Sequence, residues 1–191
     1  QPEQDFFLSA ERYFSKFTEK AAAAIAQALP ATSETARQPR RKPQPPANAR
    51  EESYTPNFPL LFPLPCGSCT RTSGYGWRTD PMGGGGTDFH LGHDLAAATG
   101  TPVLAAADGV VRVAGKHASY GNYLRILHAD GDETLYAHMQ YLFVSTGAVV
   151  TAGQVLGVVG ETGNATGPHL HFEILHKGLR YDPAQALQDA A

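Results

Sequence analysis

The stretch of sequence that decides the fold is Leu170-His171-Phe172-Glu173-Ile174-Leu175, near the carboxyl end of the chain. Its alternation of apolar and polar side chains is typical of a β-strand with one buried face. Three earlier runs, at 110–113, 123–127 and 133–136, also have the composition of strands. Glycine-containing turns separate these runs, so we expect neighbouring strands to pair antiparallel. The sequence therefore predicts a mainly β fold, an antiparallel β-sheet or sandwich.

Length and composition agree with one such domain plus extensions. The chain has 191 residues with 42% hydrophobic residues, and its 20 glycines and 14 prolines favour turns and short strands over a helical bundle. The net charge of −3 is too small to indicate a nucleic-acid partner. No apolar run approaches the roughly 18 residues of a transmembrane segment. The sequence begins at Gln1 without a methionine, which is compatible with removal of a signal peptide.

The composition divides the chain into three parts: an amphipathic helical segment at 1–29, a Pro-rich basic linker at 30–57 and the folded domain at 58–191. In the first part, apolar residues recur at helical spacing from Phe6 to Ala28, and Pro30 ends the pattern. We interpret this segment as a helix that docks on its own chain or continues an upstream helix. A membrane-surface helix is disfavoured because its charges are mixed.

The linker has a composition that cannot form a core. It contains five basic residues, four prolines and no acidic residue from Arg37 to Arg50. We therefore expect this segment to be extended and mobile. The simpler interpretation is a solubilising spacer, and the alternative is a contact with anionic wall polymers or phospholipid.

The two cysteines, Cys66 and Cys69, stand in a Cys-Gly-Ser-Cys sequence. A zinc ribbon needs a second such pair, which the chain lacks, and a thioredoxin-like pair would precede a helix. We expect a local disulfide formed in an oxidising compartment, with two free thiols as the alternative.

The candidate chemistry lies in clustered histidines. His169 and His171 are two residues apart on a predicted strand, so their side chains lie on one face, about 7 Å apart. One imidazole can then bind a metal while the other contacts a water molecule on that metal. The intervening Leu170 points to the opposite face.

His90 and Asp94 are a second pair of candidate ligands. A fully extended strand would hold them about 13 Å apart, but Gly92 permits a bend that brings them together. Two histidines and an aspartate make a three-ligand zinc site whose fourth position is open, as in catalytic zinc sites. Because a single histidine is more often structural, the hypothesis depends on the combination.

Several motifs resemble those of the lysostaphin/LytM-type peptidoglycan endopeptidases. The pattern His90-x-Gly92-x-Asp94, followed later by His169-x-His171, is similar to the signature of that family. Further blocks match in the same order, among them Tyr120-Gly121-Asn122, Tyr136-Ala137-His138-Met139 and Asp182-Pro183. The resemblance covers roughly residues 64–183.

The resemblance implies a role for each site residue. His90, Asp94 and His171 would hold one Zn²⁺ per chain, and His138 and His169 would be the catalytic pair. Zinc lowers the pKa of its water toward about 7 and polarises the scissile carbonyl. A neutral imidazole can accept the proton and return it to the leaving amine, while a second imidazole stabilises the oxyanion.

The substrate implied by the resemblance is peptidoglycan, cleaved in its stem peptides or cross-bridges. This places the protein outside the cytoplasm of a bacterium: secreted, periplasmic or in the cell envelope. The rival interpretation is a non-catalytic LytM-like activator or scaffold of another cell-wall hydrolase. Such relatives usually lose ligand residues, and this chain retains all of them.

Three positions leave questions for the structure. His93 stands where the family usually has an aliphatic residue, and alternation should turn it away from the metal. The glycine-rich loop 82–87 lacks the tyrosine that some members carry there. Arg78 is either a contact for a substrate carboxylate or a residue that stabilises the fold.

Overall fold

Antiparallel strands make up almost all of the secondary structure of residues 43–188, the part of the chain that the computed structural model describes. The predicted mainly β fold is confirmed, whereas the helix predicted within residues 1–29 lies outside the described residues. No helix in the range 43–188 is long and apolar enough to cross a membrane.

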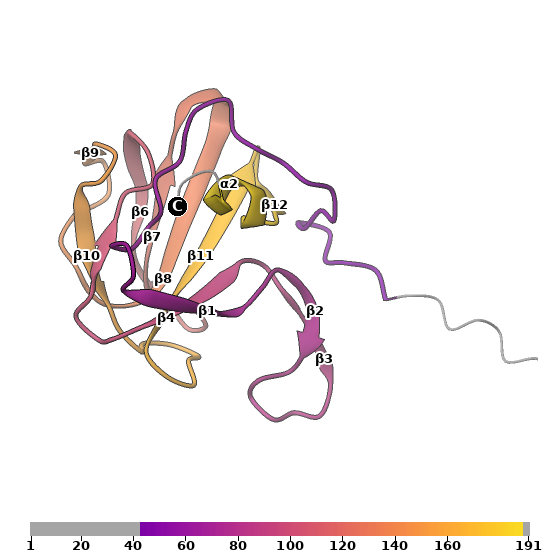
Figure 1. Cartoon of the computed structure of the whole chain (residues 1–191). Coiled ribbons are helices and arrows are strands. Elements are labelled where there is room, and N and C mark those ends of the chain that lie inside the picture. The colour runs from indigo at the N-terminus through magenta and orange to yellow at the C-terminus, as the bar shows by residue number, and fades with distance from the viewer. Residues whose placement is uncertain (1–42, 189–191) are drawn as a thin grey trace, which may run out of the picture. The chain divides into compact units, whose positions relative to one another are not determined.

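Ten strands form one large sheet (Figure 1). Its main path, in spatial order, is β1 (Cys69–Ser73), β4 (His93–Ala97), β11 (His169–His176), β8 (Asp132–Leu142), β7 (Gly121–Leu127), β6 (Gly109–His117) and β9 (Val149–Val150). Three strands join this path from the side: β5 (Pro102–Leu104), β10 (Val155–Val159) and β12 (Leu179–Tyr181).

The remaining elements are small. The strands β2 (Gly76–Thr79) and β3 (Thr87–His90) form a separate hairpin that projects from the large sheet in Figure 1. A 3-10 turn, η1 (Ala129–Gly131), links β7 to β8, and the short helix α2 (Ala184–Gln188) follows β12.

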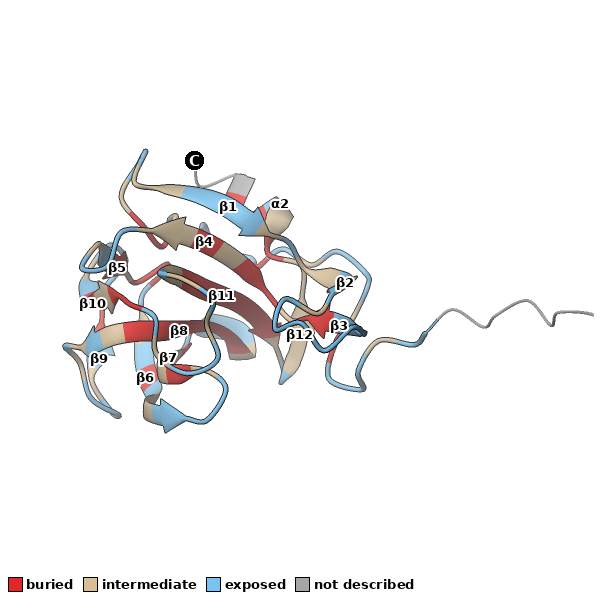
Figure 2. Cartoon of the chain, turned by 90° about the horizontal axis from the view of Figure 1, so that it is seen from below, coloured by how far each residue is buried: buried red, intermediate tan, exposed pale blue. Residues whose placement is uncertain are grey.

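Alternation along β11 separates the core from the opposite face of the sheet. Leu170, Phe172 and Ile174 are buried in the main hydrophobic core, together with residues of β4, β8 and β10. His171 and Glu173 project from the other face, as period-two geometry requires. Figure 2 shows buried residues concentrated on β11 and β8, further buried residues on β4 and at the end of β3, and exposed residues along β1.

A close backbone approach explains the glycine between β3 and β4. A Cβ atom added at Gly92 would lie 2.2 Å from the carbonyl oxygen of Phe172. The chain leaves the hairpin at His90 and enters the large sheet at His93, and only glycine fits where it crosses β11.

A β-bulge interrupts β8 at His138. On β7, Asn122 and Leu124 are two residues apart, but their partners on β8, Met139 and Tyr136, are three apart. Tyr136 and Met139 both point into the core, so His138 is the extra residue. Its φ of 61° lies in the left-handed region, which a non-glycine residue rarely adopts.

The described part of the expected linker packs against the domain, so it is not the mobile chain that its composition predicts. The compact unit begins at Gln44. Ala49 is 1% exposed and forms a parallel bridge with Arg180 at the edge of the sheet. The hydroxyl of Tyr54 lies 2.7 Å from a carboxylate oxygen of Asp132. We call residues 44–57 the strap.

The reason for the difference is that an edge strand offers unpaired backbone groups. Arg50 N–H donates to the carbonyl of Arg180, and Arg180 N–H donates to the carbonyl of Asn48, both at 2.9 Å. A proline-rich extended chain can satisfy such an edge because only alternate residues need a backbone N–H. The basic residues at 37–42 lie outside the described residues.

The cysteines also differ from the prediction. Cys66 is exposed, Cys69 packs against the core at the start of β1, and both are free thiols. The structure thus agrees with the alternative prediction, two free thiols.

Candidate active site

All five predicted site residues line one cleft of about 360 Å³. The residues are His90, Asp94, His138, His169 and His171. They come from the consecutive strands β3 and β4 and from β8 and β11, which follow much later in the sequence, and all four strands meet at one side of the sheet.

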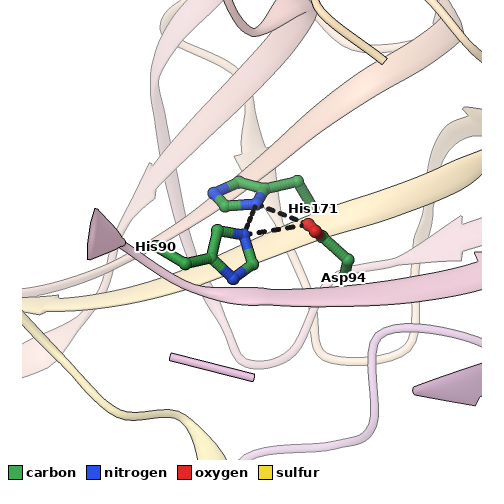
Figure 3. A group of neighbouring side chains, drawn as sticks. All are labelled: His90, Asp94 and His171. Atoms are coloured by element: carbon green, nitrogen blue, oxygen red, sulfur yellow. Dashed lines mark hydrogen bonds and ion pairs between the residues drawn. The ribbon is translucent and has the colours of Figure 1, made fainter. Parts of the chain in front are cut away.

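Three of these side chains converge on one point (Figure 3). His90 Nε2 lies 3.0 Å from His171 Nδ1 and 3.1 Å from Asp94 Oδ1, and His171 Nδ1 lies 2.9 Å from the same oxygen. Strand register produces part of this arrangement, because His171 on β11 pairs directly with Asp94 on β4. The bend at Gly92 supplies His90.

Each of the three side chains is held from behind by another group. The Nδ1 atom of His90 donates to the carbonyl of Gly74 at 2.7 Å. The Nε2 atom of His171 donates to Glu173 at 3.1 Å. Because a carbonyl and a carboxylate only accept hydrogen bonds, these contacts fix both tautomers and leave His90 Nε2 and His171 Nδ1 as lone pairs.

Asp94 is held in a similar way. The guanidinium of Arg78 donates to Asp94 Oδ2 at 2.8 Å and to the hydroxyl of Ser73 at 2.7 Å. Of the two roles left open for Arg78, the structure therefore favours support of the fold, here of the aspartate itself. The oxygen Oδ1 stays directed toward the two histidines.

This donor set fits a zinc ion. Ligands about 2.0–2.1 Å from a tetrahedral ion lie about 3.3–3.4 Å from one another, close to the observed separations. Two lone pairs and a carboxylate oxygen within about 3 Å repel one another unless a cation lies among them. The residues of the chain therefore fit the metal that the sequence predicts.

The pKa values of His171 and Asp94 also indicate that a positive charge between these side chains is stabilised. Burial alone lowers the pKa of His171, but its contacts with Asp94 and Glu173 raise it to about 9. Burial alone raises the pKa of Asp94, but the contacts with His171 and His90 hold it far below the usual range. A proton or a metal ion at the centre satisfies this group.

The predicted catalytic pair lies next to the three converging residues. The ring centroids of His138 and His169 are 4.6 Å apart, and those of His138 and His171 are 5.9 Å apart. His138 Nδ1 donates to the carbonyl of Thr162, and His169 Nδ1 donates to the carbonyl of Gly167, both at 2.8 Å. Each ring therefore keeps its lone pair on Nε2.

His138 is neutral at pH 7. Burial lowers its pKa to about 4, because the charged form loses solvation and because His169 and His171 lie nearby. The β-bulge is what turns this side chain from the core to the cleft, since regular alternation after Tyr136 would point it inward.

Residues that sequence reasoning missed lie behind the predicted ones. Glu173, Tyr120 and Thr162 support the histidines. The contacts of Tyr120 and Thr162 join segments far apart in the sequence, whereas Glu173 lies two residues after His171 on the same face of β11, a spacing from which the contact could have been predicted. The prediction for His93 was correct: it faces away from the cleft, and its Nε2 lies 2.9 Å from Asp182. The glycine-rich loop 82–87 borders the cleft through Met82.

Comparison with known proteins identifies the family. Residues 88–183, half of the chain, match Peptidase family M23. The catalytic domain of lysostaphin from Staphylococcus simulans superposes with a TM-score of 0.57 at 32% identity, over 63% of this chain and 92% of that domain. The chain belongs to Peptidase family M23. The predicted resemblance is thereby confirmed.

Other M23 relatives extend the comparison. A zinc-containing peptidase from Vibrio cholerae superposes with a TM-score of 0.61 at 37% identity, over 65% of this chain and 39% of that one. The protein named DD-carboxypeptidase/endopeptidase Mpg from Neisseria meningitidis is 48% identical over 95 residues, which are 50% of this chain and 22% of Mpg. The part of this M23 chain that matches thus covers less than a quarter of the length of this curated relative.

Proposed function

We propose that this chain is a zinc-dependent endopeptidase that hydrolyses peptide bonds in peptidoglycan stem peptides or cross-bridges. The observation that carries the proposal is the convergence of His90 Nε2, Asp94 Oδ1 and His171 Nδ1 within about 3 Å, beside two further histidines in one cleft. Membership of family M23 supports the choice of substrate. So does the name of a Vibrio cholerae relative, Peptidoglycan DD-endopeptidase ShyC, which is 45% identical over 94 residues.

In this proposal, His90, Asp94 and His171 hold one Zn²⁺ per chain. When bound, zinc supplies Lewis acidity that polarises a peptide carbonyl and makes water more acidic. The chain supplies the rest of the chemistry. Arg78, Gly74 and Glu173 keep the three ligands oriented.

His138 and His169 act on protons. Both present the Nε2 lone pair, since their Nδ1 atoms donate to backbone carbonyls. One imidazole accepts a proton from the attacking water and passes it to the leaving amine. The other ring, whose centroid lies 4.6 Å away, would stabilise the oxygen that gains negative charge in its protonated form, in which Nε2 carries a hydrogen that it donates to that oxygen.

The test is a digest of defined, cross-linked muropeptides followed by mass spectrometry. We expect the zinc-loaded chain to release new termini at one type of peptide bond, and a chelator to stop the reaction until zinc is restored. The variants His90→Ala, Asp94→Ala and His171→Ala should lose the metal, because three protein ligands are the usual minimum. Full zinc occupancy in all three variants contradicts the ligand assignment.

The same digest separates the proposal from a non-catalytic activator or scaffold. Such a protein would bind zinc or wall fragments without releasing any terminus. A substrate in the cell wall also implies a location outside the cytoplasm, which is part of the proposal.

A further inference from the structure

Glu173 is a fully buried carboxylate for which the proposed reaction has no direct use. It is 0% exposed and lies on β11, two residues after His171 and on the same face. One of its oxygens, Oε1, accepts from His171 Nε2 at 3.1 Å and from the hydroxyl of Tyr120. The other, Oε2, accepts from Arg180 Nε at 2.7 Å.

An ionised side chain without solvent is costly unless its partners compensate for the lost hydration. Arg180 on β12 supplies the opposite charge, and its own backbone is held by the strap through Asn48 and Arg50. Three donors from three different segments thus surround one carboxylate. Of these three donors, His171 alone is itself a proposed metal ligand.

We propose that Glu173 is a positioning residue that fixes His171 with Nδ1 toward the metal and so sets the zinc affinity of the site. The inference rests on the proposed function in one respect, the role of His171 as a ligand. A hydrogen-bond acceptor behind a ligating histidine holds the ring in place, keeps the required tautomer and makes the other nitrogen a better ligand.

The substitution Glu173→Gln tests this role with little change of shape. An amide has one acceptor and one donor group, so it cannot replace both carboxylate oxygens. If the NH₂ group faces Arg180, two donors oppose each other. If it faces His171, the ring must carry its hydrogen on Nδ1, and the lone pair for the metal is lost.

Glu133 offers a matched control on β8. It is also a buried glutamate, 2% exposed, and it pairs with Arg112 and Arg125. Its partner in the register is Leu175, four residues beyond His171 on β11, and it does not line the cleft. The variant Glu133→Gln therefore loses a similar buried charge without touching the site.

The experiment measures the zinc dissociation constant of the whole 191-residue chain by competition with a chromophoric chelator, alongside the unfolding temperature of the metal-free protein. We expect Glu173→Gln to weaken zinc binding by about 10–100-fold. Glu133→Gln should destabilise the protein but bind zinc as the unchanged chain does. The absorption spectrum of bound Co²⁺ should change only in Glu173→Gln.

A milder variant keeps the test decisive if Glu173→Gln does not fold. Tyr120→Phe removes one donor to Glu173 but keeps the ring that packs 5.8 Å from His171, so zinc binding should weaken by less than in Glu173→Gln. The inference is overturned if Glu173→Gln binds zinc as tightly as Glu133→Gln and the unchanged chain. If Glu173→Gln does not fold, the same result in Tyr120→Phe overturns it. If the unchanged chain binds no zinc, the proposed function itself fails.

Discussion

At the scale of single residues, the site depends on one unusual backbone conformation. His138 has a φ of 61°, and a non-glycine residue in this region costs about 1–3 kcal/mol. Contacts on both sides hold it there: the N–H of His138 donates to the carbonyl of Tyr120, and the ring donates to Thr162. The imidazole of His138 reaches the cleft because the backbone adopts this strained conformation.

We predict that His138→Ala and His169→Ala retain zinc but lose most peptidase activity. Neither ring is among the three converging residues, whereas a general acid or base contributes about 10²–10⁴-fold to a rate. Atomic absorption measures whether the variants retain zinc, and the rate of cleavage of a soluble cross-linked peptide measures the loss of activity. Near-normal rates in both zinc-loaded variants would show that these histidines are structural.

At the scale of elements, the crossing from β3 to β4 is the place where added side-chain volume does most harm. Gly92 lies directly against β11, and the same crossing brings His90 to Asp94. Added volume there pushes β4 away from β11 and separates the three converging side chains.

We predict that Gly92→Ala lowers the free energy of unfolding by about 1–3 kcal/mol or more, because the new Cβ meets backbone that cannot move aside. Zinc content should fall as well. Urea unfolding of the metal-free protein measures the first effect. Gly115→Ala is the control, since a Cβ at Gly115 in β6 meets nothing within 4 Å. Equal stability of the two variants would contradict the steric argument.

The strands were predictable where alternation is strong and not where tertiary contacts decide. The runs 110–113, 123–127, 133–136 and 170–175 all lie within observed strands. The other eight strands within residues 43–188, which have two to five residues each, were not predicted, because so few residues beside turns carry too little pattern. The β-bulge at His138 was also missed, since only pairing with β7 reveals an extra residue.

In the site, too, with one exception, the residues marked by a local sequence pattern were predicted and those defined by tertiary contacts were not. The spacing of His90, Asp94 and His171 suggested a zinc site, and the family resemblance supplied their roles together with those of His138 and His169. The supporting groups Gly74 and Thr162 could not be found, because their function depends on which distant segment approaches them. Glu173 is the exception, since it was missed although it follows His171 by two residues on the same face of its strand.

At the scale of the whole molecule, a buried hydrogen-bond chain joins the core to a turn. His128 Nδ1 donates to the carbonyl of Asp108, so Nε2 accepts from the hydroxyl of Thr134. Thr134 in turn lies 2.9 Å from the hydroxyl of Tyr136, which accepts from the N–H of Ala106. Protonation of His128 would reverse one donor and leave a buried hydroxyl without an acceptor.

We predict that this chain loses stability in mild acid because of His128. Burial lowers the pKa of His128 below its ordinary value of 6.5, so the unfolded state binds the proton more strongly. The contribution is fully present above pH 6.5 and decreases as the pH falls below it. Urea unfolding of metal-free protein between pH 7.5 and 5 measures this decrease, which should be smaller in His128→Gln. Identical slopes would contradict the assignment.

We also predict different outcomes for two shortened chains. A chain that begins at Gln44 should keep zinc and stability, because the compact unit begins there. A chain that begins at Phe58 loses the backbone bonds of the strap and the Tyr54 contact, which should cost roughly 2–4 kcal/mol. Thermal unfolding distinguishes the two. Equal midpoints would show that the strap contributes nothing to the fold.

The strap has a consequence for the behaviour of this protein in concentrated solution. Where Ala49 pairs with Arg180, it occupies backbone groups that would otherwise face outward along β12. An open strand edge is a template on which a second molecule can add its own strand, and repeated addition leads to aggregation. By covering this edge of β12, a strand that lies more than 120 residues later in the sequence, the strap should reduce the tendency of the protein to associate with itself.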